Sequence, residues 1–183
     1  MTGTTRKPAE DGSNVEQFPV ELCFDTIREN ARFIPRNAFA VAGYVNGANT
    51  RFIWTPNEWR MFPSSGKLRI NVTGSHLTGN VLDVEKGDAR PEHVPGWYDA
   101  RRKAGETSLI VYCNRSNLDA VNHALAGRPC WRWIATLDGT MQHDNRAMIQ
   151  FSNSRLAGGP YDVSVIWKSR LANAIGGMTN IPS

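Results

Sequence analysis

Short apolar segments that recur along the chain constrain its fold more than any other feature. Each spans five to seven residues, is rich in β-branched or aromatic side chains, and is followed by turn residues or a helical pattern. The pattern predicts eight strands, at residues 20–26, 39–45, 67–73, 81–85, 108–113, 132–137, 148–152 and 161–167. The polar residues 1–17 are expected to form a flexible arm, and residues 18–183 are long enough for one domain with a core.

Helical patterns separate the earlier strands. Residues 55–62 (TPNEWRMF) begin with a Thr cap, a Pro at the first helical position and a Glu at the third, which is a capping-box arrangement. Residues 90–104 are followed by Gly105 as the expected C-cap, and residues 116–125 begin with Ser116 as the expected N-cap. This alternation predicts an α/β fold, a small (β/α) barrel of the TIM type. The alternative is an open doubly wound sheet, which the lack of a Gly-rich loop after the first strand weakens.

The last strand is expected to run in the opposite direction. Only the segment SNSRLAGGP separates the seventh strand from the eighth. A parallel crossover needs a dozen or more residues, whereas an antiparallel return needs only a few. Residues Tyr161 and Asp162 then lie at the carboxyl ends of the other strands, where barrel active sites are built.

Four carboxylates are predicted at that same end. Asp25 ends the first strand, Asp162 begins the eighth, and Asp83 and Glu85 end the fourth, where residues two apart share a face. Such a cluster stores repulsion and raises the pKa of at least one member. Cleavage of a glycosidic bond requires a protonated carboxyl beside an ionised one.

The length and position of each acidic side chain suggest its role in catalysis. Glu85 has the longer side chain and lies further out, so it is the candidate general acid. Asp83 is the candidate base, or it orients the group that attacks the anomeric carbon, and Asp25 and Asp162 would tune pKa values and hold the sugar. The alternative for each acid taken alone is an inert surface carboxylate.

A divalent metal site is a rival interpretation of the same acids, because hard cations such as Mg²⁺ prefer oxygen ligands. No transition-metal centre and no cofactor are expected, because the four histidines do not cluster with the acids in sequence. These are His76, His93, His123 and His143.

Aromatic and amide side chains near the strand ends suit a sugar cleft. The candidates for substrate binding are Tyr44, Asn46, Tyr112, Asn114, Trp133 and Gln150, with Tyr161 beside them. Sugar rings stack on aromatic faces, and amides hydrogen bond to hydroxyl groups. The alternative is that the six Trp and four Tyr residues fill the core and that the amides are satisfied within the protein.

Charge and hydropathy narrow the range of partners. The formal net charge is +4, and the basic residues are scattered, which favours solvated faces over a nucleic-acid patch. A mild positive field suits an anionic polymer such as a bacterial cell wall. No apolar run approaches a membrane span, and the N-terminal segment lacks the apolar core of a signal peptide. Cys23 and Cys113 lie within predicted strands and, with Cys130, show no metal spacing.

The chain resembles glycoside hydrolase family 25 and the related glycoside-hydrolase-like domains of actinobacteria and their phages. The resemblance rests on LCFDT (22–26), AGYVNG (42–47), WTPNEWRMF (54–62), VLDVEKGDA (81–89), VYCNRS (111–116), WIATLDG (133–139), IQF (149–151) and YDVSV (161–165). It implies a barrel with an antiparallel last strand and cleavage of the β-1,4 bond between N-acetylmuramic acid and N-acetylglucosamine. It places Glu85 as proton donor beside Asp25, Asp83 and Asp162. Asn46 departs from a common Asp, and Leu137 from a common aromatic residue.

Three hypotheses follow. The first is a muramidase acting on peptidoglycan, encoded by a phage and found in the host cytoplasm before lysis or in the virion. The second is a catalytically weak barrel that serves as a binding or structural module of a phage tail, attached to other virion proteins through the N-terminal arm. The third is a metal-dependent phosphodiesterase. Neither a nucleic acid nor a membrane is an expected partner.

Overall fold

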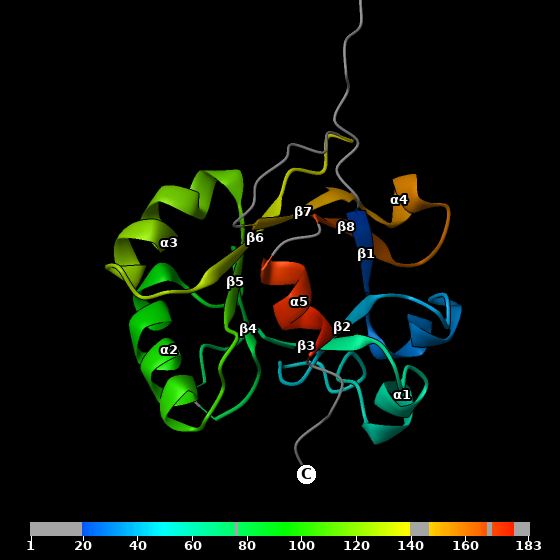
Figure 1. Cartoon of the computed structure of the whole chain (residues 1–183), viewed down its shortest axis with the longest axis horizontal. Helices are drawn as coiled ribbons and strands as arrows, with labels where there is room; N and C mark the ends of the chain where they lie inside the picture. The colour runs from blue at the N-terminus through cyan, green and yellow to red at the C-terminus, as the bar shows by residue number, and fades with distance from the viewer. Residues whose placement is uncertain (1–19, 76, 140–146, 168–169, 178–183) are drawn as a thin grey trace, which may run out of the picture.

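Eight strands form a closed barrel in which each strand lies beside its neighbours in the sequence (Figure 1). The computed structural model describes residues 20–75, 77–139, 147–167 and 170–177, so the predicted arm lies outside the described residues. The strands are β1 (Val20–Asp25), β2 (Ala40–Tyr44), β3 (Gly66–Asn71), β4 (Val81–Val84), β5 (Ile110–Asn114), β6 (Trp131–Ala135), β7 (Ala147–Ser152) and β8 (Asp162–Trp167). Every predicted strand is present, and the predicted small TIM-like barrel is confirmed.

The direction of the last strand is also confirmed. β8 pairs antiparallel with both β7 and β1, whereas all the other pairs are parallel. Asp162 therefore lies directly opposite Asp25 in the register of β1 and β8. The short β7–β8 connection has room for one helical turn, α4 (Ser154–Ala157), but not for a crossover.

Helices cover the outside and one end of the barrel. They are α1 (Pro56–Arg60), α2 (Val94–Lys103), α3 (Leu118–Leu125) and α5 (Arg170–Gly176), with 3₁₀ turns η1 (Arg28–Phe33), η2 (Pro91–His93) and η3 (Arg115–Asn117). The capping box at the start of α1 is confirmed. The prediction of Ser116 as an N-cap is wrong, because η3 precedes α3 and the Asn114 side chain accepts the Asn117 N–H instead.

The barrel interior is apolar at one end. Side chains from Leu68, Ile110 and Met148 pack there with Ala172 and Ile175 of α5. In Figure 1, α5 lies across the ring of strands. Gly66, at the start of β3, is close enough to the Ile175 carbonyl that a side chain would clash with it. Helix α5 therefore closes the amino-terminal end of the parallel strands, which we call the floor, and the other end, the mouth, is left for polar residues.

Two apolar layers cover the outside of the barrel. α2 and α3 lie side by side over β4 and β5 (Figure 1), with the Trp97 indole buried among Leu82 and Val111. Around β1 and β2, Trp54 and Phe62 pack on the outward-facing side chains. Within the described ranges, no helix combines the length and the apolar character that a bilayer span requires.

Candidate active site

A polar pocket of about 240 Å³ opens at the mouth of the barrel, and we call it the mouth pocket. Its lining residues are Asp25, Tyr44, Ile70, Asp83, Glu85, Asp88, Tyr112, Trp133, Leu137, Gln150 and Asp162. The structure thus brings together all four carboxylates that the sequence places at this end. Four of the six candidate substrate-binding residues line the pocket with them.

Strand geometry explains the convergence. Asp25 is the last residue of β1, and Asp162 is the first residue of the antiparallel β8, so the two lie side by side. Asp83 points inward from β4, opposite Tyr112 of β5, and Glu85 follows two residues later. A parallel β8 would place Asp162 at the floor, so the reversal of one strand assembles the cluster.

Two of the acids are buried, and each has a carboxylate oxygen without a hydrogen bond in the described part of the chain. Asp25 is 7% exposed and Asp83 is 6% exposed, and among the described residues neither Asp25 Oδ2 nor Asp83 Oδ1 has a hydrogen-bond partner. Burial raises the pKa of both carboxyls well above the ordinary value, and neighbouring carboxylates raise them further. Protonation is therefore the state that burial favours for these two groups.

Asp162 is held differently. The Ser154 N–H donates to Asp162 Oδ1 at 2.7 Å, and Gln150 Nε2 donates to Oδ2 at 2.8 Å. Burial raises the pKa of Asp162, but both hydrogen bonds oppose that rise. Because Nε2 of Gln150 is used in this way, its buried Oε1 is left as an acceptor with no partner among the described residues. Asp162 is the acid of the cluster best prepared to stay ionised.

Glu85 lies at intermediate depth, where a ligand can reach it. Burial raises its pKa, and the charge of Asp88 raises it further. Sequence reasoning missed Asp88 as a pocket residue. The signal was present in the glycine that precedes it, because Gly87 has a φ of 103° and turns the chain back toward the mouth.

Aromatic rings form the pocket wall. Tyr112 and Trp133 meet edge to face with centroids 5.0 Å apart, and Trp133 Nε1 donates to Ser164 Oγ at 2.9 Å. Burial raises the pKa of the Tyr44 and Tyr112 phenols, so both hydroxyl groups stay protonated. Leu137 lines the pocket where the resemblance leads one to expect an aromatic ring.

Two predicted ligand contacts lie outside the lining of the mouth pocket. The amide of Asn46 donates to Asn71 Oδ1 and Thr73 Oγ1, and its oxygen accepts the Val72 N–H. Asn114 caps η3 through its side-chain oxygen. Both amides fasten loops at the mouth, and their contact with a ligand stays a prediction.

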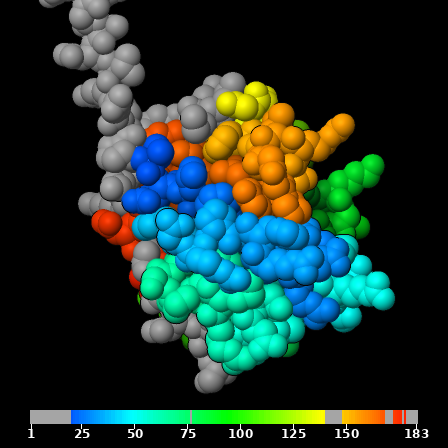
Figure 2. All heavy atoms as spheres, turned by 90° about the vertical axis from the view of Figure 1, so that its right-hand side faces the viewer, coloured from blue at the N-terminus to red at the C-terminus, as the bar shows by residue number. Residues whose placement is uncertain are grey.

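A second pocket of about 260 Å³ continues the mouth pocket to one side, and we call it the side pocket. The two share Asp25, Tyr44 and Asp162, and Tyr161 lines the side pocket only. Figure 2 shows the segments around β1 and β2 lying against the segment between β7 and β8, where Thr26 Oγ1 donates to the Pro160 carbonyl at 2.6 Å. The acids thus lie within an extended cleft.

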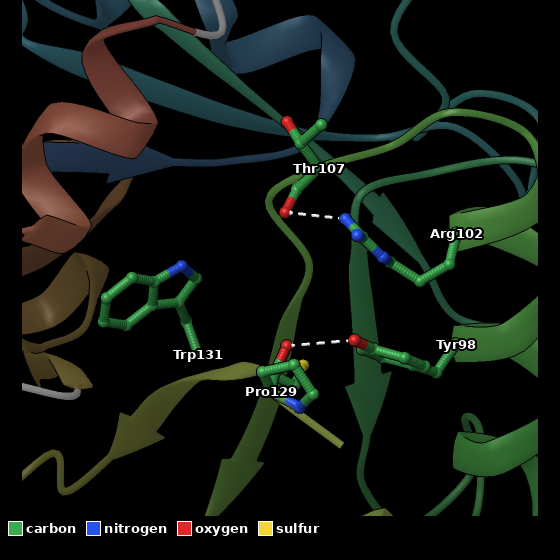
Figure 3. Close-up of a pocket in the computed structure, with 6 residues that line it drawn as sticks. Tyr98, Arg102, Thr107, Pro129 and Trp131 are labelled. Atoms are coloured by element: carbon green, nitrogen blue, oxygen red, sulfur yellow. Dashed lines mark hydrogen bonds between the residues drawn. The ribbon is translucent and has the colours of Figure 1, made fainter.

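The third pocket lies near the floor and is larger, about 400 Å³, and we call it the floor pocket. It is lined by Tyr98, Arg102, Thr107, Pro129, Cys130 and Trp131. Figure 3 shows Tyr98 donating to the Pro129 carbonyl and Arg102 donating to the Thr107 carbonyl. None of its lining residues is an acid.

The described part of the chain holds no group of His, Cys, Asp and Glu side chains that could bind a metal ion. His76 lies outside the described residues, as does His143. The three cysteines are free thiols, and Cys23 and Cys113 are buried within β1 and β5 as their sequence positions predict.

Comparisons with known proteins give one distant likeness. No protein-family model matches the chain, and no curated protein matches it. Among solved structures, the spore cortex lytic enzyme SleM of Clostridium perfringens is similar, with a TM-score of 0.48 and 14% sequence identity. The match covers 80% of this chain and 67% of SleM, and it is too slight to carry a function from one chain to the other.

Proposed function

We propose that this protein is a peptidoglycan hydrolase that cleaves the β-1,4 bond between N-acetylmuramic acid and N-acetylglucosamine. The observation that carries the proposal is the convergence of Asp25, Asp83, Glu85 and Asp162 on one aromatic-lined pocket. The ordered sequence resemblance to family 25 supports the choice of polymer and bond.

Glu85 is the proton donor in this proposal. Its position between the buried acids and the solvent lets the carboxyl approach a glycosidic oxygen, and burial, with the charge of Asp88, raises its pKa and so favours the protonated form. A general acid must be protonated before the bond breaks, and a raised pKa extends that state toward neutral pH.

Asp162 and Asp83 act on the other side of the bond. The two hydrogen bonds to Asp162 favour its ionised form. This carboxylate stabilises the positive charge that develops at the anomeric carbon. Asp83 orients the attacking group, or it accepts a proton from that group once it has lost the proton that its burial favours. Asp25, buried beside Asp162, raises the pKa of Asp83 and helps to hold the sugar.

The shape of the cleft suits a chain of sugars. The partly exposed rings of Tyr44 and Tyr112 offer apolar faces beside the acids, with the buried Trp133 packed behind Tyr112. The side pocket continues past Asp25 and Asp162, so a ligand longer than one sugar can extend along both pockets.

Analysis of the reducing ends released from purified cell walls tests the proposal. Wild-type protein should release N-acetylmuramic acid reducing ends, and Glu85→Gln should lower the rate by about 10²-fold or more. Glu92→Gln is the matched control, since Glu92 is an exposed acid of the following turn that lies outside the pocket lining. Release of N-acetylglucosamine ends would refute the bond assignment. Co-sedimentation with walls without any release would favour the binding-module hypothesis.

The phage origin and the location in host cytoplasm or virion stay predictions from the sequence. The same holds for attachment to virion proteins through residues 1–17. Nothing in the barrel or its pockets bears on them.

A further inference from the structure

We propose that Asp88 is a positioning residue that acts through Glu85: its carboxylate at the rim of the mouth pocket favours the protonated, proton-donating form of Glu85. This inference rests on the proposed function for its catalytic meaning. It adds a fifth acid to the four that the sequence analysis selected.

A tight turn holds Asp88 beside Glu85. The Asp88 N–H donates to the Glu85 carbonyl at 3.1 Å, and the Ala89 N–H donates to the Asp83 carbonyl at 3.2 Å. Gly87 supplies the positive φ that the turn needs, and the Ala89 side chain is buried immediately after it. The backbone of Asp88 is therefore fixed at both sides, and its side chain lines the pocket.

The charged and titratable side chains around Glu85 differ in how deeply they are buried. Acids and phenols line the pocket with it: Asp25 from β1, Tyr44 from β2, Asp83 from β4, Tyr112 from β5, Asp162 from β8, and Asp88 from its own loop. The basic residues nearest to Glu85 along its own loop are Lys86 and Arg90, and Arg115 follows the neighbouring strand β5. All three are exposed.

Asp88 is the exposed acid of this set, while Asp25 and Asp83 are buried. Burial favours the neutral form of a carboxyl, so the two deep acids contribute less negative charge than their number suggests. Asp88 keeps contact with water, and within the described residues no ion pair neutralises its side chain. Partial burial raises the pKa of Asp88 as well, so its influence on Glu85 fades as the pH falls.

Direct titration of Glu85 tests the inference without needing hydrolysis. The ¹³C-carboxyl NMR signal of Glu85 should show a titration midpoint about 0.5 pH unit lower in Asp88→Asn than in wild type, the scale expected for one screened like charge. Asp88→Glu should restore most of the midpoint, and Glu92→Gln should leave it unchanged. Added salt should lower the wild-type midpoint more than that of Asp88→Asn.

The alkaline limb of the hydrolysis profile should move by the same amount in Asp88→Asn. An unchanged Glu85 midpoint in that variant overturns the inference. Slower hydrolysis with both the midpoint and the alkaline limb unmoved also overturns it and would make Asp88 a direct glycan contact. A shifted midpoint in a protein that releases no reducing ends, wild type included, supports the coupling and refutes the proposed function separately.

Discussion

The mouth pocket and the floor pocket differ in a way that volume does not reveal. The floor pocket is larger, at about 400 Å³ against about 240 Å³. Tyr98 and Arg102 of the floor pocket donate to backbone carbonyls. The mouth pocket instead leaves Asp25 Oδ2, Asp83 Oδ1 and Gln150 Oε1 buried without a partner among the described residues. Unsatisfied polar groups cost stability, so they, more than size, distinguish a site built for chemistry.

Strand β6 runs between the two regions and carries an indole for each. Trp131 lines the floor pocket, and Trp133, two residues later, lines the mouth pocket. Trp133 is 1% exposed and hydrogen bonded to Ser164, whereas Trp131 is only partly buried. The two indoles therefore differ in burial: Trp133 belongs to the central core as well as to the mouth pocket, whereas Trp131 packs against that core and lines the floor pocket.

The largest expected effect follows from that pair. Trp133→Ala should lower the free energy of unfolding by about 3–5 kcal/mol, because it removes a fully buried ring and leaves the Ser164 hydroxyl without its donor. Trp131→Ala should cost less than half as much. Denaturant unfolding followed by circular dichroism measures both, and equal losses would show that the floor is packed as tightly as the mouth.

A smaller effect of opposite sign is expected at the acids. Asp83→Asn should raise the free energy of unfolding at neutral pH by about 1 kcal/mol, the scale of one unit of pKa shift. Because the pKa of Asp83 is raised in the folded state, the wild-type protein loses stability as the pH rises above 3.8, the ordinary pKa of an Asp side chain. The gain in stability of Asp83→Asn should therefore vanish below about pH 4.

Asp99, beside the floor pocket, is the contrast. Its hydrogen bonds with Arg128 lower its pKa, so its contribution to stability is present at neutral pH and lost in acid. Asp99→Asn should therefore bring no gain at neutral pH. Thermal unfolding across pH measures both variants, and a stabilising Asp99→Asn would remove the difference between the two ends.

The smallest effect belongs to the floor pocket. Tyr98→Phe removes a hydrogen bond of 3.2 Å, which is long for a hydroxyl donor, so the cost should be about 0.5 kcal/mol. Release of wall reducing ends should stay at the wild-type rate. A strong loss of hydrolysis with unfolding unchanged would show that the floor pocket takes part in the reaction.

The strand pattern and one loop length were sufficient to predict the barrel. Short apolar segments, rich in β-branched and aromatic side chains, located the strands. The nine residues 152–160 were too few for a crossover, so β8 was expected to run antiparallel. Helix α5 was missed because its short amphipathic pattern gains meaning only when Ile175 meets the barrel floor. The N-cap of the helix expected at residues 116–125 was assigned to Ser116 because a 3₁₀ turn before a helix leaves little sequence trace.

The sequence predicted the acidic residues of the candidate site better than its amide residues. Asp25, Asp83, Glu85 and Asp162 follow from strand ends, because the topology alone decides where a strand end lies. The contacts of Asn46 depend on the loop after β3, whose path the sequence does not fix. Asp88 enters the pocket through a turn, and strand periodicity does not extend into turns.

The reversal of β8 also decides at which end of the barrel the first and last strands meet the rest of the chain. Val20, at the start of β1, pairs with Trp167, at the end of β8, and α5 follows across the floor. Any module joined ahead of Val20 or behind α5 is therefore tethered at the back of the barrel. The acid-lined mouth lies at the opposite end of the barrel from both of these positions.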